Sequence, residues 1–165
     1  MDFKDALKNA GVNVADKPVK IDSKNANIKI KLDRTEKILE KLKEATVELD
    51  NTSNQKEFEL VQTKLILYYQ RFCDAVKDLL DVVATKEKVK GISDNRGIGE
   101  LIRKTFDILD IEDMQQDIIK RLTSRNDIVH DYMNVEYYDE AITTQVMNDI
   151  EVYVQYFDKI KSYFN

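Results

Sequence analysis

The clearest hydrophobic pattern in the chain runs through its centre. Apolar residues recur there at steps of three or four positions, the spacing of the buried face of an α-helix: Phe58, Val61, Leu65, Tyr68, Phe72, Val76, Leu79 and Val83. We therefore predict one long amphipathic helix in this region. The preceding stretch DNTSN, residues 50–54, favours a turn and supplies capping residues for the helix start.

Similar patterns on both sides predict further helices. Helices are expected over about 98–109, from Asp110 as a capping residue to near Val129, and over 136–164. Only NIKIKL, residues 27–32, alternates with the period of a β-strand. The helix before the DNTSN turn carries its apolar side on Ile38, Leu42, Ala45 and Leu49.

This succession of elements predicts an all-α fold, an antiparallel bundle of four or five helices spanning residues 26–165. Residues 1–25 lack a sustained period, and we expect an N-terminal arm. One proline and four glycines also favour long uninterrupted helices. The single cysteine, Cys73, fits the apolar pattern as a core residue. With no internal disulfide, no signal peptide and no membrane-spanning stretch in the sequence, we expect a cytoplasmic protein.

Charge is distributed unevenly along the chain. The net charge of −5 disfavours broad binding to a polyanion, and residues 106–165 carry 13 acidic against 5 basic residues. Residues 20–49 and 85–105 are basic instead. Lys86, Lys88, Lys90 and Arg96 lie on a glycine-containing connection and are the candidate RNA-binding residues. The lysines at 24, 29, 31 and 37 are interpreted as a solvated helix face.

Several kinds of active site are excluded by composition. One histidine and one cysteine cannot form a Cys/His zinc site or the paired Glu-x-x-His motifs of a di-metal bundle. No glycine-rich phosphate loop follows a predicted strand. We therefore expect neither a metal nor a cofactor.

The remaining candidate chemistry is concentrated in RNDIVHDY, residues 125–132. Asn126 and His130 are four positions apart, so they share one face if the helix continues, and the long side chain of Arg125 can reach that face. Histidine can move the protons of RNA phosphodiester cleavage, and arginine can stabilise the charged phosphorus centre. Because one histidine does not readily serve as both acid and base, this chemistry predicts a homodimer. A lone histidine at a helix end is also commonly structural, and spacing alone favours that interpretation.

The string R-N-x-x-x-H-x-Y resembles the R-x4-H-x-Y signature of HepT-like toxins in the HEPN superfamily. The order and length of the predicted helices over about residues 30–164 agree with this resemblance. It implies a dimeric helical bundle that cleaves RNA without metal, with Arg125 and His130 as the catalytic pair and Asn126 as a polar companion. It also implies a nucleotidyltransferase antitoxin as partner, which would modify Tyr132 with AMP.

The chain departs from the HEPN pattern in two respects. Its N-terminal arm has no counterpart in the compact members, and two acidic residues, Asp127 and Asp131, flank the candidate pair. The acidic residues leave an alternative open: a non-catalytic HEPN adaptor that binds a nucleotide or substrate for a nucleotidyltransferase.

Overall fold

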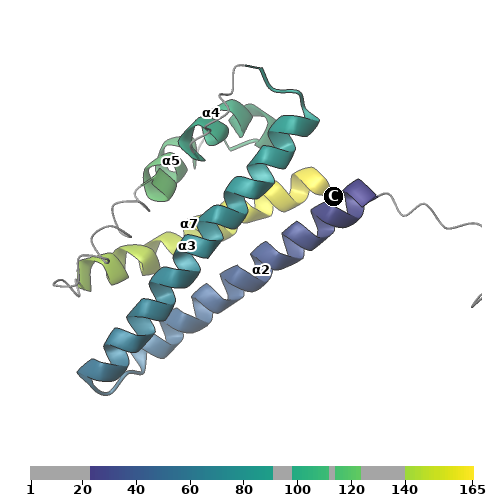
Figure 1. Ribbon diagram of the computed structural model, residues 1–165. Helices are drawn as coiled ribbons and strands as arrows, with labels where there is room; N and C mark the ends of the chain where they lie inside the picture. The colour runs from purple at the N-terminus through teal and green to yellow at the C-terminus, as the bar shows by residue number, and fades with distance from the viewer. Residues whose placement is uncertain (1–22, 91–97, 112–113, 124–139) are drawn as a thin grey trace, which may run out of the picture.

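A computed structural model of the chain describes residues 23–90, 98–111, 114–123 and 140–165. Within these ranges there are five helices and no strand, which confirms the predicted all-α class (Figure 1). The helices are α2 (Ser23–Asp50), α3 (Gln55–Lys86), α4 (Ile98–Leu109), α5 (Gln115–Thr123) and α7 (Glu140–Phe164). None of the helices in the described part combines the length and the apolar composition needed to cross a membrane.

Helices α2 and α3 form a long antiparallel hairpin around the predicted turn (Figure 1). Asn54 caps α3, because its side-chain oxygen accepts a hydrogen bond from the backbone N–H of Glu57 at 3.0 Å. The Glu57 carboxylate reaches back and accepts bonds from the backbone N–H and the hydroxyl of Ser53 at 3.1 and 2.9 Å, which lower its pKa. The reciprocal arrangement is a capping box, and it fixes where the second helix of the hairpin begins.

The NIKIKL stretch lies inside α2 and is helical, so its alternating pattern did not decide the local structure. Helix α2 also begins at Ser23, three residues before the expected start of the bundle at residue 26. The inward face farther along α2 agrees with the expectation. Leu42, Ala45 and Leu49 are buried, and Ile38 is half-buried beside them.

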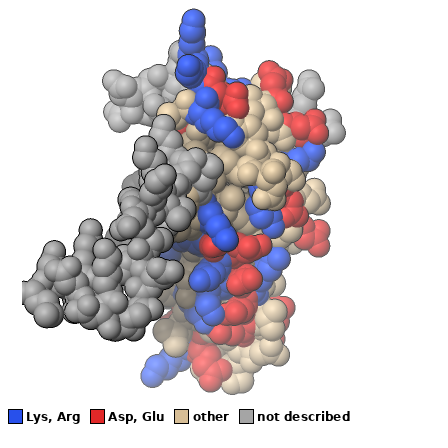
Figure 2. Space-filling view, turned by 90° about the vertical axis from the view of Figure 1, so that its right-hand side faces the viewer, with Lys and Arg blue, Asp and Glu red and all other residues tan. Residues whose placement is uncertain are grey.

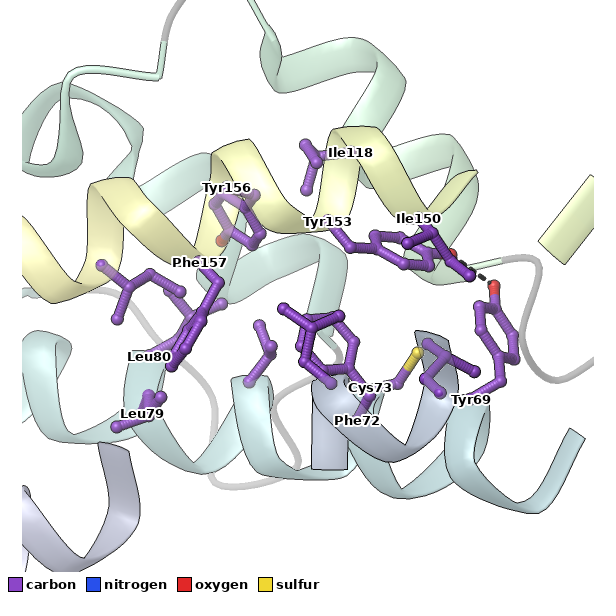
Figure 3. Close-up of a cluster of buried hydrophobic side chains, with 14 of the residues drawn as sticks. Tyr69, Phe72, Cys73, Leu79, Leu80, Ile118, Ile150, Tyr153, Tyr156 and Phe157 are labelled. Atoms are coloured by element: carbon purple, nitrogen blue, oxygen red, sulfur yellow. Dashed lines mark hydrogen bonds between the residues drawn. The ribbon is translucent and has the colours of Figure 1, made fainter. Parts of the chain in front are cut away.

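Helix α7 runs beside α3 in the same direction. Thr143, Tyr153 and Tyr163 of α7 meet residues 62, 69 and 87 in that order. An aromatic layer fills the middle of this contact, where the ring of Tyr153 lies 5.7 Å from that of Tyr69 and 5.3 Å from that of Phe72 (Figure 3). These separations are typical of favourable aromatic pairs. Cys73 lies in the same layer with 1% of its surface exposed, as the apolar pattern predicted.

Helices α4 and α5 pack together on the other side of α7 from α2 (Figure 1). Asp110 was expected to cap the start of the fourth helix. It instead follows the last residue of α4, and α5 begins only at Gln115. Its backbone is left-handed, with φ 53°, and the N–H of Ile111 bonds to the carbonyl of Phe106 at 3.2 Å. Aspartate tolerates this conformation better than most residues, so it can terminate a helix where glycine is more usual. Val129 and residues 136–139, expected in the last two helices, lie outside the described residues.

The two tyrosines Tyr153 and Tyr156 provide a matched test of this packing. Both are fully buried, but Tyr153 donates a hydrogen bond to Tyr69 at 2.8 Å, whereas the hydroxyl of Tyr156 has no partner among the described residues. We predict that Tyr153→Phe lowers the free energy of unfolding by about 1 kcal/mol, while Tyr156→Phe leaves it unchanged or raises it by a similar amount. Urea denaturation at neutral pH measures both.

The burial of Tyr156 also predicts how the stability of the fold depends on alkaline pH. Burial raises the pKa of Tyr156 above its ordinary value, so the folded chain holds this proton after the unfolded chain has lost it. The stabilisation that depends on this proton is therefore fully present below about pH 10, the ordinary pKa of tyrosine, and is lost as the pH rises further. Tyr156→Phe should lose less stability than the wild type above about pH 10. Equal alkaline losses in the two proteins would contradict the proposed cause.

Candidate functional site

The candidate residues of the RNDIVHDY motif lie between α5 and α7 in the sequence. Arg125, Asn126, His130 and Tyr132 are outside the described residues, as is Arg96. The structure does describe both flanks of this segment, since α5 ends at Thr123 and α7 begins at Glu140. The side chains that hold these two helix ends therefore make up the described part of the candidate site.

An ion pair joins α5 to α7 near the motif. Arg121, two residues before the end of α5, contacts the Oδ1 atom of Asp149 on α7. The Asp149 side chain is only 2% exposed, whereas that of Arg121 is 28% exposed. A buried carboxylate is costly unless a charged or hydrogen-bonding partner compensates it, so this pair strongly favours one arrangement of the two helices.

Two phenols extend this contact to α3. The hydroxyl of Tyr69 donates to the backbone carbonyl of Arg121 at 2.9 Å, and the hydroxyl of Tyr153 donates to that of Tyr69 (Figure 3). The carbonyl is one of the last four of α5, which have no partner within the helix. A tyrosine phenol is protonated at neutral pH, and burial raises the pKa of Tyr153 further, so this group acts as a hydrogen-bond donor.

A third polar contact fixes the start of α7. The side-chain amide of Gln62 on α3 donates to the hydroxyl of Thr143 at 2.7 Å, and both residues are buried. We call Gln62, Tyr69, Arg121, Thr143, Asp149 and Tyr153 the polar frame. It connects three helices, α3, α5 and α7, at the end of the bundle where the motif segment leaves and re-enters the described structure.

The polar frame can position groups, but its own members do not suggest a reaction centre. Its phenols are held as donors and its one carboxylate is neutralised by Arg121. In the described part of the chain, no group of three or more His, Cys, Asp or Glu residues is arranged to hold a metal ion. The second carboxylate oxygen of Asp149 has no hydrogen-bond partner among the described residues, so it remains available as an acceptor.

Sequence reasoning missed the polar frame because its members occupy core positions. Asp149 belongs to the inward face of α7 together with Val146 and Tyr153, at helical spacing. Gln62 likewise lies on the inward face of α3, between Phe58 and Leu65. The available signal was a charged or amide residue within an apolar stripe, since such a residue needs a buried partner.

The candidate RNA-binding lysines lie at the end of α3 and beyond it. The ammonium of Lys86 is 4.8 Å from the centre of the Tyr163 ring and 5.9 Å from that of Phe164, so it makes cation–π contacts. Lys88, with φ 52°, and Lys90 are both exposed. Lys86 therefore has a structural contact, and the other two are accessible to a ligand.

Basic and acidic side chains are intermingled on the molecular face shown in Figure 2. Between α2 and α3, Lys31 contacts Asp78 at 3.9 Å, and Lys64 contacts Glu48 at 2.7 Å. Such pairs cancel charge locally and add little stability when exposed. Any anion bound on this face would need a local site rather than a general positive potential.

Comparison of the chain with known protein families, curated proteins and solved structures finds no match. The HEPN resemblance is thus carried by the R-N-x-x-x-H-x-Y string and the predicted order of the helices.

The buried ion pair of the frame can be tested against an exposed one on the same helix. Asp149→Ala leaves Arg121 without its carboxylate, and we predict a loss of about 3 kcal/mol in the free energy of unfolding. Asp158, which contacts Lys161 at 2.9 Å and is 58% exposed, is the matched control. Asp158→Ala should cost less than about 1 kcal/mol. Equal losses in denaturant titrations would show that burial does not strengthen the frame.

Proposed function

We propose that the chain is a HEPN-type toxin, a homodimeric endoribonuclease that needs no metal ion. Arg125 and His130 of two chains would together form one active site in the dimer cleft. The observation that carries the proposal is the string R-N-x-x-x-H-x-Y at residues 125–132, which holds the only histidine of the sequence. A nucleotidyltransferase antitoxin would neutralise the enzyme by modifying Tyr132.

Two properties of the described residues support this proposal. The described elements are all helical, as the HEPN resemblance requires. The polar frame also holds the helices on both sides of the motif segment through the buried Asp149 carboxylate and its partner Arg121. Catalytic groups must be held in a narrow range of positions, so rigid supports beside them are favourable.

The proposed reaction uses one histidine from each chain. The 2′-oxygen of a ribose attacks the neighbouring phosphorus while the bond from phosphorus to the 5′-oxygen breaks. One His130 removes the proton of the 2′-hydroxyl, and the other donates a proton to the leaving 5′-oxygen. Arg125 stabilises the negative charge on the phosphoryl oxygens. The products are a 2′,3′-cyclic phosphate and a 5′-hydroxyl end.

The reaction is tested with single-stranded RNA and purified protein in the presence of a chelator. We predict that the wild type cleaves the RNA and that His130→Ala or Arg125→Ala lowers the rate by at least about 100-fold. Arg71, an exposed arginine on α3, is the control, and Arg71→Ala should cleave at the wild-type rate. Circular dichroism checks that each variant is folded.

Two results would overturn the ribonuclease proposal. One is cleavage that survives His130→Ala, and the other is cleavage that depends on added Mg²⁺. Sedimentation of the active protein as a monomer would contradict the two-chain active site, because one chain supplies only one histidine.

Silencing by the antitoxin is tested on Tyr132. Transfer of AMP would add bulk and negative charge beside a cleft that must receive an RNA phosphate. We predict that Tyr132→Phe retains cleavage but is neither labelled nor silenced by a nucleotidyltransferase encoded beside this chain. Tyr163→Phe is the control. It removes a hydroxyl that donates a hydrogen bond to Glu87, the residue that follows α3, and it should be labelled like the wild type. Mass spectrometry of the co-expressed proteins locates the modification; labelling of Tyr132→Phe would refute the assignment.

The alternative function is a non-catalytic HEPN adaptor for a nucleotidyltransferase. It is favoured by Asp127 and Asp131, whose negative charges flank the candidate pair and oppose phosphate binding. An adaptor would form a tight complex with the nucleotidyltransferase yet leave RNA intact and cells unharmed when expressed alone. These outcomes separate it from the toxin.

A further inference from the structure

A groove is lined by one side of α2 and by Tyr68 of α3. Its volume is about 500 Å³, within the range of sites for small ligands. It is separate from the polar frame, although Tyr68 is the neighbour of Tyr69 in the sequence. The lining residues are Ile30, Asp33, Arg34, Lys37, Ile38, Lys41 and Tyr68.

Two of the three cations that line the groove are in no ion pair within the described part of the chain. Lys41 contacts Glu44 at 2.6 Å, and Lys31 just outside the groove contacts Asp78. Arg34 and Lys37, by contrast, form no ion pair among the described residues, and both are exposed one helical turn apart. With Lys41 paired to Glu44, the charges of Arg34 and Lys37 against that of Asp33 leave the groove with one net positive charge, on a chain with a net charge of −5.

The groove also presents an aromatic and aliphatic surface between these charges. Ile30 is 65% exposed and contributes apolar surface to the groove. Tyr68 is half-buried and lines the groove, so part of its side chain is accessible from it. An aromatic ring that shares a groove with a guanidinium and an ammonium group is the combination that binds single-stranded nucleic acids, with bases stacked on the ring and phosphates on the cations.

We propose that this groove binds single-stranded RNA, with a base on the Tyr68 ring and the adjoining phosphates on Arg34 and Lys37. The choice of RNA as the ligand rests on the proposed function. The groove would hold the strand outside the reacting centre and contribute to affinity rather than to the chemical step. It assigns a binding role to Lys37, which the sequence placed on a solvated face.

The test measures binding of a fluorescent oligouridylate to full-length His130→Ala protein, which keeps the RNA intact, over a series of salt concentrations. For a single strand, the slope of log K against log salt falls by about 0.7 for each phosphate contact that is lost. Arg34→Ala and Lys37→Ala should each reduce the slope by about this amount. Tyr68→Ala should weaken binding about tenfold, whereas Tyr68→Phe, which keeps the ring, should bind like the parent.

Matched controls lie outside the groove on the same two helices. Lys43 on α2 and Arg71 on α3 are exposed, and Lys43→Ala and Arg71→Ala should leave both the affinity and the slope unchanged. Groove variants that bind like the parent, or that lose no more than these controls, would overturn the proposal. Equal affinity for AMP and the oligouridylate would also overturn it, because a free nucleotide would then be the ligand.

The groove proposal and the ribonuclease proposal can be refuted independently of each other. If the wild type cuts no RNA but the groove variants still lose binding, the groove is supported and the ribonuclease is refuted. If the wild type cuts RNA and the groove variants change neither binding nor KM, the groove is refuted and the ribonuclease remains.

Discussion

The parallel packing of α7 on α3 is the contact on which the rest of the bundle depends. Tyr69, Phe72 and Tyr153 form its centre, and Phe157 continues the layer 6.5 Å from Phe72. Two neighbouring helices that run in the same direction cannot be joined by a tight turn, so the chain must return between them. Helices α4 and α5 belong to that return (Figure 1). This requirement brings the end of α5 to the start of α7, where the polar frame lies.

The sequence predicted the long helices well because their stability comes mainly from one repeated apolar face. The stripe from Phe58 to Val83 and the cap at Asn54 both correspond to features of the structure. The prediction was poorer where a local pattern competed with packing. NIKIKL alternates like a strand, yet it lies within α2, and Asp110 has the chemistry of an N-cap but ends α4. In both places the surrounding residues, and not the local pattern, determined the secondary structure.

The parts of the candidate site also differ in whether the sequence could predict them. RNDIVHDY could be found from spacing because its residues are close in sequence. The polar frame and the groove could not, because each joins residues far apart in the chain. Gln62 and Thr143 are separated by 81 positions, and the groove needs Tyr68 to lie against α2. Their composition is ordinary for a helix, and only the tertiary arrangement gives them a role.

The Arg121–Asp149 pair has a consequence for how this sequence can diverge. Replacing both residues by apolar side chains of similar volume is often neutral in a protein core. Either single replacement, however, passes through a chain with an uncompensated charge, and when residue 121 changes that charge is the Asp149 carboxylate, whose side chain is only 2% exposed. The two positions are therefore expected to change together or not at all. In descendants of this chain, an altered residue 121 without an altered residue 149 would mark a protein that has lost the junction between α5 and α7.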